Sequence, residues 1–129
     1  MKYAIVCVDD EPVIVELLSF QLKKLFNEES TFVETYTNPK EVEEGIDNII
    51  AHGIQVIFMV VDYQMPLLNG AQLIRSIKAK YPMIKFFMLS GQANSSVVDQ
   101  LLEEGILERF IAKPWSEKDL KVALDEFIL

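Results

Sequence analysis

Residues 56–61 read VIFMVV, and the acidic residue Asp62 follows them directly. An apolar run without a polar residue at every second position is typical of a strand that helices cover on both faces, as in a parallel sheet. Residues 3–8, YAIVCV, have the same character and are followed by Asp9 and Asp10. The two runs therefore predict a parallel sheet whose strands end in carboxylates.

Short apolar runs alternate with segments of helical period along the whole chain. We expect strands at residues 3–8, 31–36, 55–61, 84–89 and 108–112. Between and after them we expect helices at residues 12–26, 39–52, 70–80, 94–105 and 116–128. This alternation predicts an α/β fold of three layers, doubly wound around a five-stranded parallel sheet, with one domain spanning residues 1–129.

The first and last helices carry clear signals. Pro12 suits the first turn of the first helix, and Ser116 is expected to cap the N-terminus of the last one. The first helix is expected to turn one apolar face inward, formed by Ile14, Leu17, Leu18, Leu22 and Leu25. The last helix is expected to bury Leu120, Leu124 and Phe127. Both helices are thus predicted to cover the sheet with one face.

The charge balance excludes several classes of partner. The chain has 129 residues, with 12 Lys and Arg against 20 Asp and Glu, and a formal net charge of −8. Nucleic acid phosphates and anionic membrane surfaces attract basic patches, and this chain has no basic run. No apolar run approaches the roughly 20 residues that span a bilayer. We therefore expect no direct contact with nucleic acid and none with a membrane.

Residues 1–8 do not resemble a complete secretion signal, because they lack a small-residue cleavage site and run straight into acidic residues. A cytoplasmic location is expected. The single cysteine, Cys7, lies among apolar residues, so we expect an inert buried thiol. With one cysteine and one histidine, His52, the chain offers no intrachain disulfide, no Cys/His zinc site and no convincing nucleophile–histidine pair.

Polar residues follow four of the predicted strands. The strand ends lead to Asp9 and Asp10, to Asp62, to Ser90 and to Lys113. Ligands bind beyond the carboxyl ends of the strands in an open parallel sheet, so these side chains are expected to converge. Clustered carboxylates repel one another unless a cation neutralises them, and an all-oxygen donor set favours Mg²⁺.

A carboxylate beside Mg²⁺ is suited to accept a phosphoryl group. With a reference pKa of about 3.9, Asp is ionised at neutral pH and attacks phosphorus without a general base. A metal ion and a fixed ammonium stabilise the charge on the transferring group, and a hydroxyl donates to another oxygen. Asp62, Lys113 and Ser90 fit these three roles of nucleophile, ammonium and hydroxyl.

Four segments in this order carry a family resemblance. They are residues 8–12 (VDDEP), residues 62–66 (DYQMP) with Gly70, residues 90–91 (SG) and residues 113–114 (KP). Together they resemble the receiver domain of two-component response regulators, and the resemblance spans the whole chain. It implies a flavodoxin-like sheet with strand order 2-1-3-4-5.

The resemblance implies a role for each acidic residue. Asp62 would accept a phosphoryl group from a histidine kinase or a phosphotransfer protein. Asp10, Asp62 and the backbone carbonyl of Gln64 would hold Mg²⁺ or Mn²⁺, and Asp9 would assist through water. The peptide bond after Lys113 would be cis, because in the family this geometry directs the lysine toward the site.

The resemblance also implies a switch with an output surface. Ser90 would move toward the phosphoryl group, and Phe110 stands at the aromatic switch position, where the family often has Tyr. A permanently packed core ring is the alternative for Phe110. Residues 94–128, with Trp115, would control an effector protein or domain, or form a phosphorylation-dependent dimer. Packing at the base of the last helix is the alternative for Trp115.

Two glutamines flank the expected site. Gln64 and Gln92 would border the line along which water attacks Asp62. They are therefore predicted to tune the lifetime of the phosphoryl group, with plainly solvated side chains as the alternative.

Three other functions share parts of this pattern. A flavodoxin-like FMN carrier needs a Ser/Thr/Gly-rich phosphate loop after the first strand, where this chain has Asp-Asp-Glu-Pro. A Mg²⁺-dependent phosphatase with an aspartyl nucleophile wants a second Asp two residues on, and that residue is Gln64. A pseudo-receiver that only binds partners has no need of both Asp62 and Lys113. We expect a phosphorylatable receiver and no enzyme, apart from Mg²⁺-dependent self-phosphorylation and slow loss of the phosphoryl group at Asp62.

Overall fold

The computed structural model describes residues 2–91 and 96–127. Within them the chain forms a five-stranded parallel sheet of order β2-β1-β3-β4-β5. The strands are β1 (Tyr3–Val8), β2 (Thr31–Tyr36), β3 (Gln55–Asp62), β4 (Lys85–Ser90) and β5 (Leu107–Ala112). The helices are α1 (Pro12–Leu25), α2 (Val42–Ala51), α3 (Gly70–Lys80), α4 (Ser96–Glu103) and α5 (Glu117–Ala123), with 3₁₀ turns at Pro39–Glu41 and Asp125–Phe127. The predicted fold class and strand order are confirmed.

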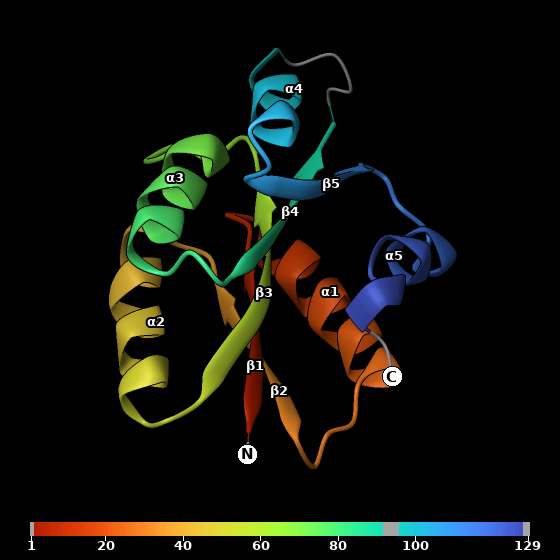
Figure 1. The fold of residues 1–129 in the computed structure, drawn as a ribbon. Coiled ribbons are helices and arrows are strands. Elements are labelled where there is room, and N and C mark those ends of the chain that lie inside the picture. Colours follow the sequence, from red (N-terminus) through yellow and green to blue (C-terminus); the bar gives the residue numbers. More distant parts are fainter. Residues whose placement is uncertain (1, 92–95, 128–129) are drawn as a thin grey trace.

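Helices cover both faces of the sheet (Figure 1). Helices α1 and α5 pack on one face, and α2, α3 and α4 pack on the other. Residues of β1 alternate between the two cores, because Ala4, Val6 and Val8 face one core while Ile5 and Cys7 face the other. Since β1 and the middle parts of β3 and β4 are buried on both faces, these stretches are continuous apolar runs in the sequence.

Cys7 lies in the middle of β1 and has no exposed surface. Burial raises the pKa of its thiol to about 12, so the thiol stays neutral at physiological pH. The predicted burial of this thiol in the core is confirmed.

Helix α1 buries only part of the stripe that the sequence predicted. Val15, Leu18 and Leu22 are buried, whereas Leu17 is 42% exposed. At about 100° per residue, the four buried positions of α1 share one arc of the helix surface, and Leu17 lies beyond the edge of that arc. The buried stripe also contains the polar residue Gln21.

Ser116 caps α5, as predicted. Its hydroxyl accepts a hydrogen bond from the backbone N–H of Asp119 at 3.0 Å, and the Asp119 carboxylate accepts one from the N–H of Ser116 at 2.9 Å. This reciprocal pair satisfies two N–H groups at the start of the helix. Leu120 and Leu124 are fully buried, although the α-helix ends at Ala123 and a 3₁₀ turn continues it. No helix in the described part of the chain has the length and apolar character that a membrane span requires.

Candidate functional site

The strand register brings the predicted polar residues to one edge of the sheet. Asp9 follows β1, Asp62 ends β3, Ser90 ends β4 and Lys113 follows β5. These strands end side by side, because Val8 pairs with Val61, Asp62 with Leu89, and Ser90 with Ala112. This is the edge at which open parallel sheets bind their ligands.

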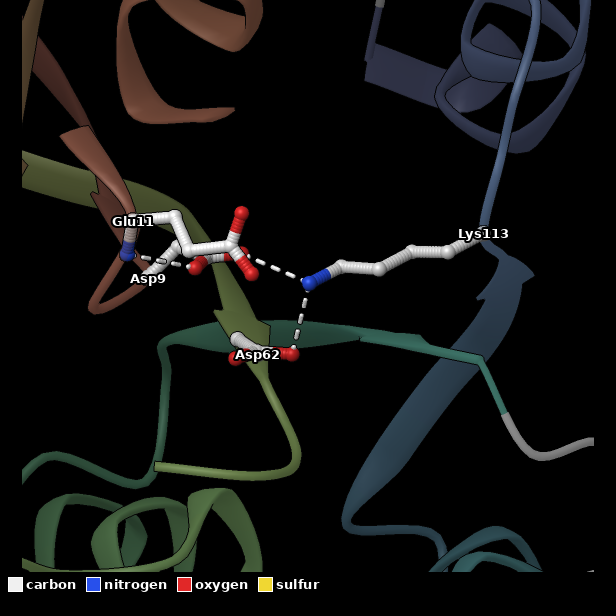
Figure 2. A network of polar contacts seen from close by, with 4 residues as sticks. All are labelled: Asp9, Glu11, Asp62 and Lys113. Carbon is white, nitrogen blue, oxygen red and sulfur yellow. Dashed lines mark hydrogen bonds and ion pairs between the residues drawn. The ribbon is translucent and has the colours of Figure 1, made fainter. Parts of the chain in front are cut away.

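Lys113 joins two buried carboxylates at this edge (Figure 2). Its ammonium nitrogen Nζ lies 2.8 Å from Oδ2 of Asp9 and 3.0 Å from Oδ1 of Asp62. Asp9 has no exposed surface and Asp62 is only 4% exposed, so water screens these two ion pairs weakly. The other oxygen of Asp9, Oδ1, accepts a hydrogen bond from the backbone N–H of Glu11 at 3.0 Å, which fixes the orientation of the carboxylate.

Asp10 completes a group of three carboxylates. Asp9, Asp10 and Asp62 each place one oxygen within 4.8 Å of the others, and Asp10 is half-buried whereas its two neighbours are buried. The ammonium of Lys113 offsets one of these charges, so the group carries a surplus of negative charge at neutral pH. An acidic set of oxygen donors that water can reach through Asp10 fits Mg²⁺.

The surroundings of Asp62 change the ionisation of its carboxyl group. Burial is the largest effect and, with the charges of Asp9 and Asp10, outweighs the hydrogen bond from Lys113, so the pKa of Asp62 rises to about 6. Burial lowers the pKa of Lys113, but hydrogen bonds to Asp9 and Asp62 outweigh burial and raise it. At neutral pH Asp62 is therefore a carboxylate beside a persistent ammonium.

The end of β4 holds the neighbouring segments together. Ser90 is 2% exposed, and its backbone carbonyl accepts a hydrogen bond from the N–H of Lys113 at 2.9 Å. The carbonyl of Leu89 accepts one from the N–H of Tyr63, also at 2.9 Å. These two backbone bonds tie the residues after β3 and β5 to β4, and so keep Asp62 and Lys113 close to Ser90.

The segment after Asp62 turns back tightly to begin α3. Gly70 is the first residue of α3, and its N–H donates to the carbonyl of Tyr63 at 2.8 Å. A Cβ atom at Gly70 would overlap the backbone carbonyl of Asp62, so this approach requires glycine. Met65 anchors the loop with a side chain that is 7% exposed, whereas Gln64 is exposed beside the site.

The predicted switch and output residues lie around this site. Phe110 is half-buried in β5 and packs against the core under α2, α3 and α4. Trp115 is half-buried and packs against the core under α1 and α5, as the packing alternative predicted. Gln92 lies outside the described residues, as do residues 94–95 and 128 of the predicted output surface.

The loop after β5 contains a contact that the sequence analysis missed. The peptide bond between Lys113 and Pro114 is cis, as the resemblance implied. The indole Nε1 of Trp115 donates a hydrogen bond to Oε1 of Gln21 on α1 at 2.8 Å. Gln21 was overlooked because α1 was interpreted from its apolar residues alone. The signal in the sequence is a polar residue at an inward-facing position, three residues after one buried leucine and one before the next.

A model of the response regulator receiver domain matches residues 5–125 of this chain. The chain belongs to the response regulator receiver domain family. The convergence of three carboxylates, a lysine and a serine at the edge of its sheet is consistent with the phosphorylation site of such a receiver. The acidic segments predicted from the sequence thus lie together in a member of the family that they resemble.

Curated relatives match this receiver over most of its length. Response regulator GtcR of Aneurinibacillus migulanus is 32% identical over 119 residues, which cover 90% of this chain and 43% of GtcR. The uncharacterized transcriptional regulatory protein YesN of Bacillus subtilis is 23% identical over 126 residues, which cover 98% of this chain and 32% of YesN. The receiver therefore spans less than half the length of these two relatives.

Solved structures share its fold. The chemotaxis protein CheY4 of Vibrio cholerae superposes with a TM-score of 0.78 at 19% identity, with 100% of both chains covered. A likeness at this level of identity establishes the fold alone.

Proposed function

We propose that this receiver is a phosphorylation switch in which Asp62 accepts a phosphoryl group from a histidine kinase or a phosphotransfer protein. The observation that carries the proposal is the ammonium of Lys113, which lies 2.8 Å from Asp9 and 3.0 Å from Asp62 beside a third carboxylate, Asp10. Further carboxylates beside an ion pair are destabilising, because like charges repel each other. An ion pair that served stability alone would therefore not be accompanied by two of them. Such a cluster is suited to hold a cation and a phosphoryl group instead.

The transfer uses Asp62 as an ionised nucleophile. One of its carboxylate oxygens forms the new bond to phosphorus while the bond between phosphorus and the donor's imidazole nitrogen breaks. The nitrogen keeps the electron pair and takes up a proton. Lys113 remains an ammonium and donates to the phosphoryl oxygens, where negative charge gathers, and Ser90 supplies a hydroxyl from the neighbouring strand.

We assign Mg²⁺ or Mn²⁺ to Asp10, Asp62 and the backbone carbonyl of Gln64, with Asp9 assisting through water. Three carboxylate oxygens within 4.8 Å of one another, and the surplus negative charge of the group, support this assignment. When bound, the ion neutralises charge on the carboxylates and the phosphoryl oxygens. This chain itself orients Asp9 through Glu11 and holds the Lys113 ammonium in place.

The output would be a changed surface rather than a product. Phosphorylation adds about −1.5 to −2 charges and biases two conformations of the chain. We assign the response to Ser90, Phe110 and the output surface of residues 94–128 with Trp115. Family membership supports an effector protein or domain as the downstream partner, or a phosphorylation-dependent dimer. We further propose that residues 1–129 act as one domain in the cytoplasm, with no direct contact to nucleic acid, which the net charge of −8 supports.

Intact-mass measurement tests the acceptor. With Mg²⁺ and acetyl phosphate, the wild-type chain is expected to gain the mass of one phosphoryl group. Asp62→Asn is expected to gain none, whereas Asp125→Asn, which changes an exposed aspartate outside the site, should match the wild type. Chelation of Mg²⁺ should stop the reaction in the wild type and in Asp125→Asn. Phosphorylation of Asp62→Asn at the wild-type rate would show that another residue is the acceptor.

A further inference from the structure

Four polar residues are buried among the described residues. Asp9, Asp62 and Ser90 form the site, whereas Gln21 stands apart on α1 and is 8% exposed. A buried amide without a partner costs free energy, so Gln21 depends on its hydrogen bond. The donor of that bond is Nε1 of Trp115, 2.8 Å away, on the loop that leaves the site.

Trp115 follows Lys113 by two residues, and the segment between them has little freedom. The N–H of Lys113 is bound by the carbonyl of Ser90 at 2.9 Å, and Ser116 begins the capped helix α5. The ring of Pro114 fixes one backbone torsion in between. A displacement of the Trp115 backbone is therefore transmitted to the backbone from which the Lys113 side chain extends.

We infer that Gln21 and Trp115 are positioning residues for Lys113, because their hydrogen bond fastens the loop after β5 to α1 and keeps the ammonium at Asp9 and Asp62. This inference rests on the proposed function, in which Lys113 stabilises charge on the group transferred to Asp62. A lysine side chain is long and flexible, so its reach depends on where its backbone is held. Small displacements of a group that must meet a transition state lower rates strongly.

An ion pair between α1 and the start of α5 provides a matched control. The ammonium of Lys24 lies 3.0 Å from Oε1 of Glu117, and the two side chains are 50% and 48% exposed. An exposed pair of this kind contributes little, because water screens it. It joins α1 to the first residue of α5, whereas the bond between Gln21 and Trp115 joins α1 to the loop that carries Lys113.

Four variants separate the hydrogen bond from the packing around it. Trp115→Phe keeps an aromatic ring and removes the N–H donor. Gln21→Leu keeps the approximate size of the side chain and removes the acceptor oxygen. Gln21→Glu, a separate single substitution, keeps an acceptor oxygen at this position. Lys24→Gln removes the exposed ion pair, together with the contact of the same ammonium with the Phe20 ring, 4.4 Å away on α1.

The first measurement is the initial rate of phosphoryl gain from acetyl phosphate with Mg²⁺, at a temperature where urea titration shows every variant to be folded. Trp115→Phe and Gln21→Leu are each expected to slow the reaction about fivefold, the factor that corresponds to one ordinary hydrogen bond. The double variant should be no slower than either single one, because both changes remove the same bond. Gln21→Glu and Lys24→Gln should react at the wild-type rate.

Two results would overturn the inference. If Trp115→Phe and Gln21→Leu gain the phosphoryl group at the wild-type rate, the contact has a purely structural role. This holds whether or not the two variants have a lower free energy of unfolding. Losses that add up in the double variant would show that the two side chains act independently of each other.

A second readout does not require phosphorylation. The side chain of Lys113 is 22% exposed and held in two ion pairs, so an amine-acetylating reagent should label it slowly. Trp115→Phe is expected to speed this labelling about fivefold relative to the exposed Lys118, as peptide mass spectrometry would measure. Unchanged labelling would overturn the inference. Faster labelling in a chain that gains no phosphoryl group would overturn the proposed function and leave the positioning of Lys113 established.

Discussion

Asp62 is a charged residue in surroundings that favour its neutral form. It is 4% exposed, and Asp9 and Asp10 add negative charge beside it. The hydrogen bond from Lys113 offsets these effects only in part, because the pKa of Asp62 is still raised to about 6. The folded chain therefore gives up stability to keep an ionised carboxylate at neutral pH, which is common where a residue has a chemical role.

Replacing Asp62 with Asn is expected to stabilise the fold at neutral pH in the absence of Mg²⁺. The carboxyl group binds its proton more tightly in the folded chain than in the unfolded chain, so its stabilising contribution is present at low pH and lost as the pH rises through about 6. The gain in the free energy of unfolding is at most about 3 kcal/mol. Urea titrations of the wild type and Asp62→Asn at about pH 8 and about pH 5 measure this gain. The difference between their free energies of unfolding should be smaller at about pH 5 than at about pH 8. A difference that widens in acid would contradict the raised pKa.

Gln64 is predicted to set the lifetime of the phosphoryl group. Its side chain is exposed two residues after Asp62, where water approaches the site. Substitution with Ala, Asn or Lys should change the half-time of phosphoryl loss severalfold and leave the affinity for Mg²⁺ nearly unchanged, since only its backbone carbonyl is assigned to the ion. Decay of the phosphorylated mass after removal of the donor measures the half-time. Equal half-times across this series, and across the same series at Gln92, would make both glutamines bystanders.

The start of α3 contributes to the position of Asp62 through contact with its backbone. Asn69 and Gln72 form a reciprocal capping box, with bonds of 2.9 and 3.2 Å between side chains and backbone N–H groups. Gly70 then places the first turn of α3 directly against the backbone of Asp62. The helix therefore holds the end of β3 in place, and the position of the Asp62 carboxylate depends on the absence of a side chain at Gly70.

Gly70→Ala is accordingly expected to destabilise the fold by roughly 1–3 kcal/mol, as overpacking of a tight contact does. The added methyl group would overlap the carbonyl of Asp62, and the loop would have to shift. Gly91→Ala is the matched control, because a Cβ at Gly91 meets nothing within 4 Å. Urea titration measures both variants, and equal losses of stability in the two would contradict this account of Gly70.

Across the whole molecule, the site and the proposed output surface share strands. Ser90 ends β4 and Lys113 follows β5, next to the helices α4 and α5. Phe110 of β5 has no hydroxyl, so packing alone would bias it between two states. Changing the ratio of two conformations from 1:99 to 99:1 requires that phosphorylation favour one of them over the other by about 5.5 kcal/mol. We therefore expect phosphorylation to shift this receiver incompletely unless a partner or self-association adds binding energy.

Amide chemical shifts with beryllofluoride, a mimic of the phosphoryl group, measure this response. We expect changes in α4, β5 and α5 as well as at the site, because Ser90 and Lys113 connect the site to these elements. The shifts should lie between those of two end states and move further when a binding partner is added. Changes confined to the residues around Asp62, with none in residues 96–127, would contradict the output model.

Local patterns in the sequence were sufficient for the strands, most helix positions and the residues that gather at the edge of the sheet. A strand buried on both faces must be apolar throughout, so β1 and β3 are visible as continuous runs with carboxylates at their ends. Parallel strands place those ends together, and for this reason the gathering of Asp9, Asp62 and Lys113 could be predicted before any distance was known.

Distances between segments far apart in the chain depended on the tertiary structure alone. The bond between Gln21 and Trp115 joins residues 94 positions apart, and no local pattern carries that separation. The exposure of Leu17 follows from the rotation of α1 on the sheet, which packing against other elements sets rather than the helix itself. The close approach at Gly70 depends on where α3 meets β3. Periodicity reports what one element buries, whereas these contacts depend on how elements meet.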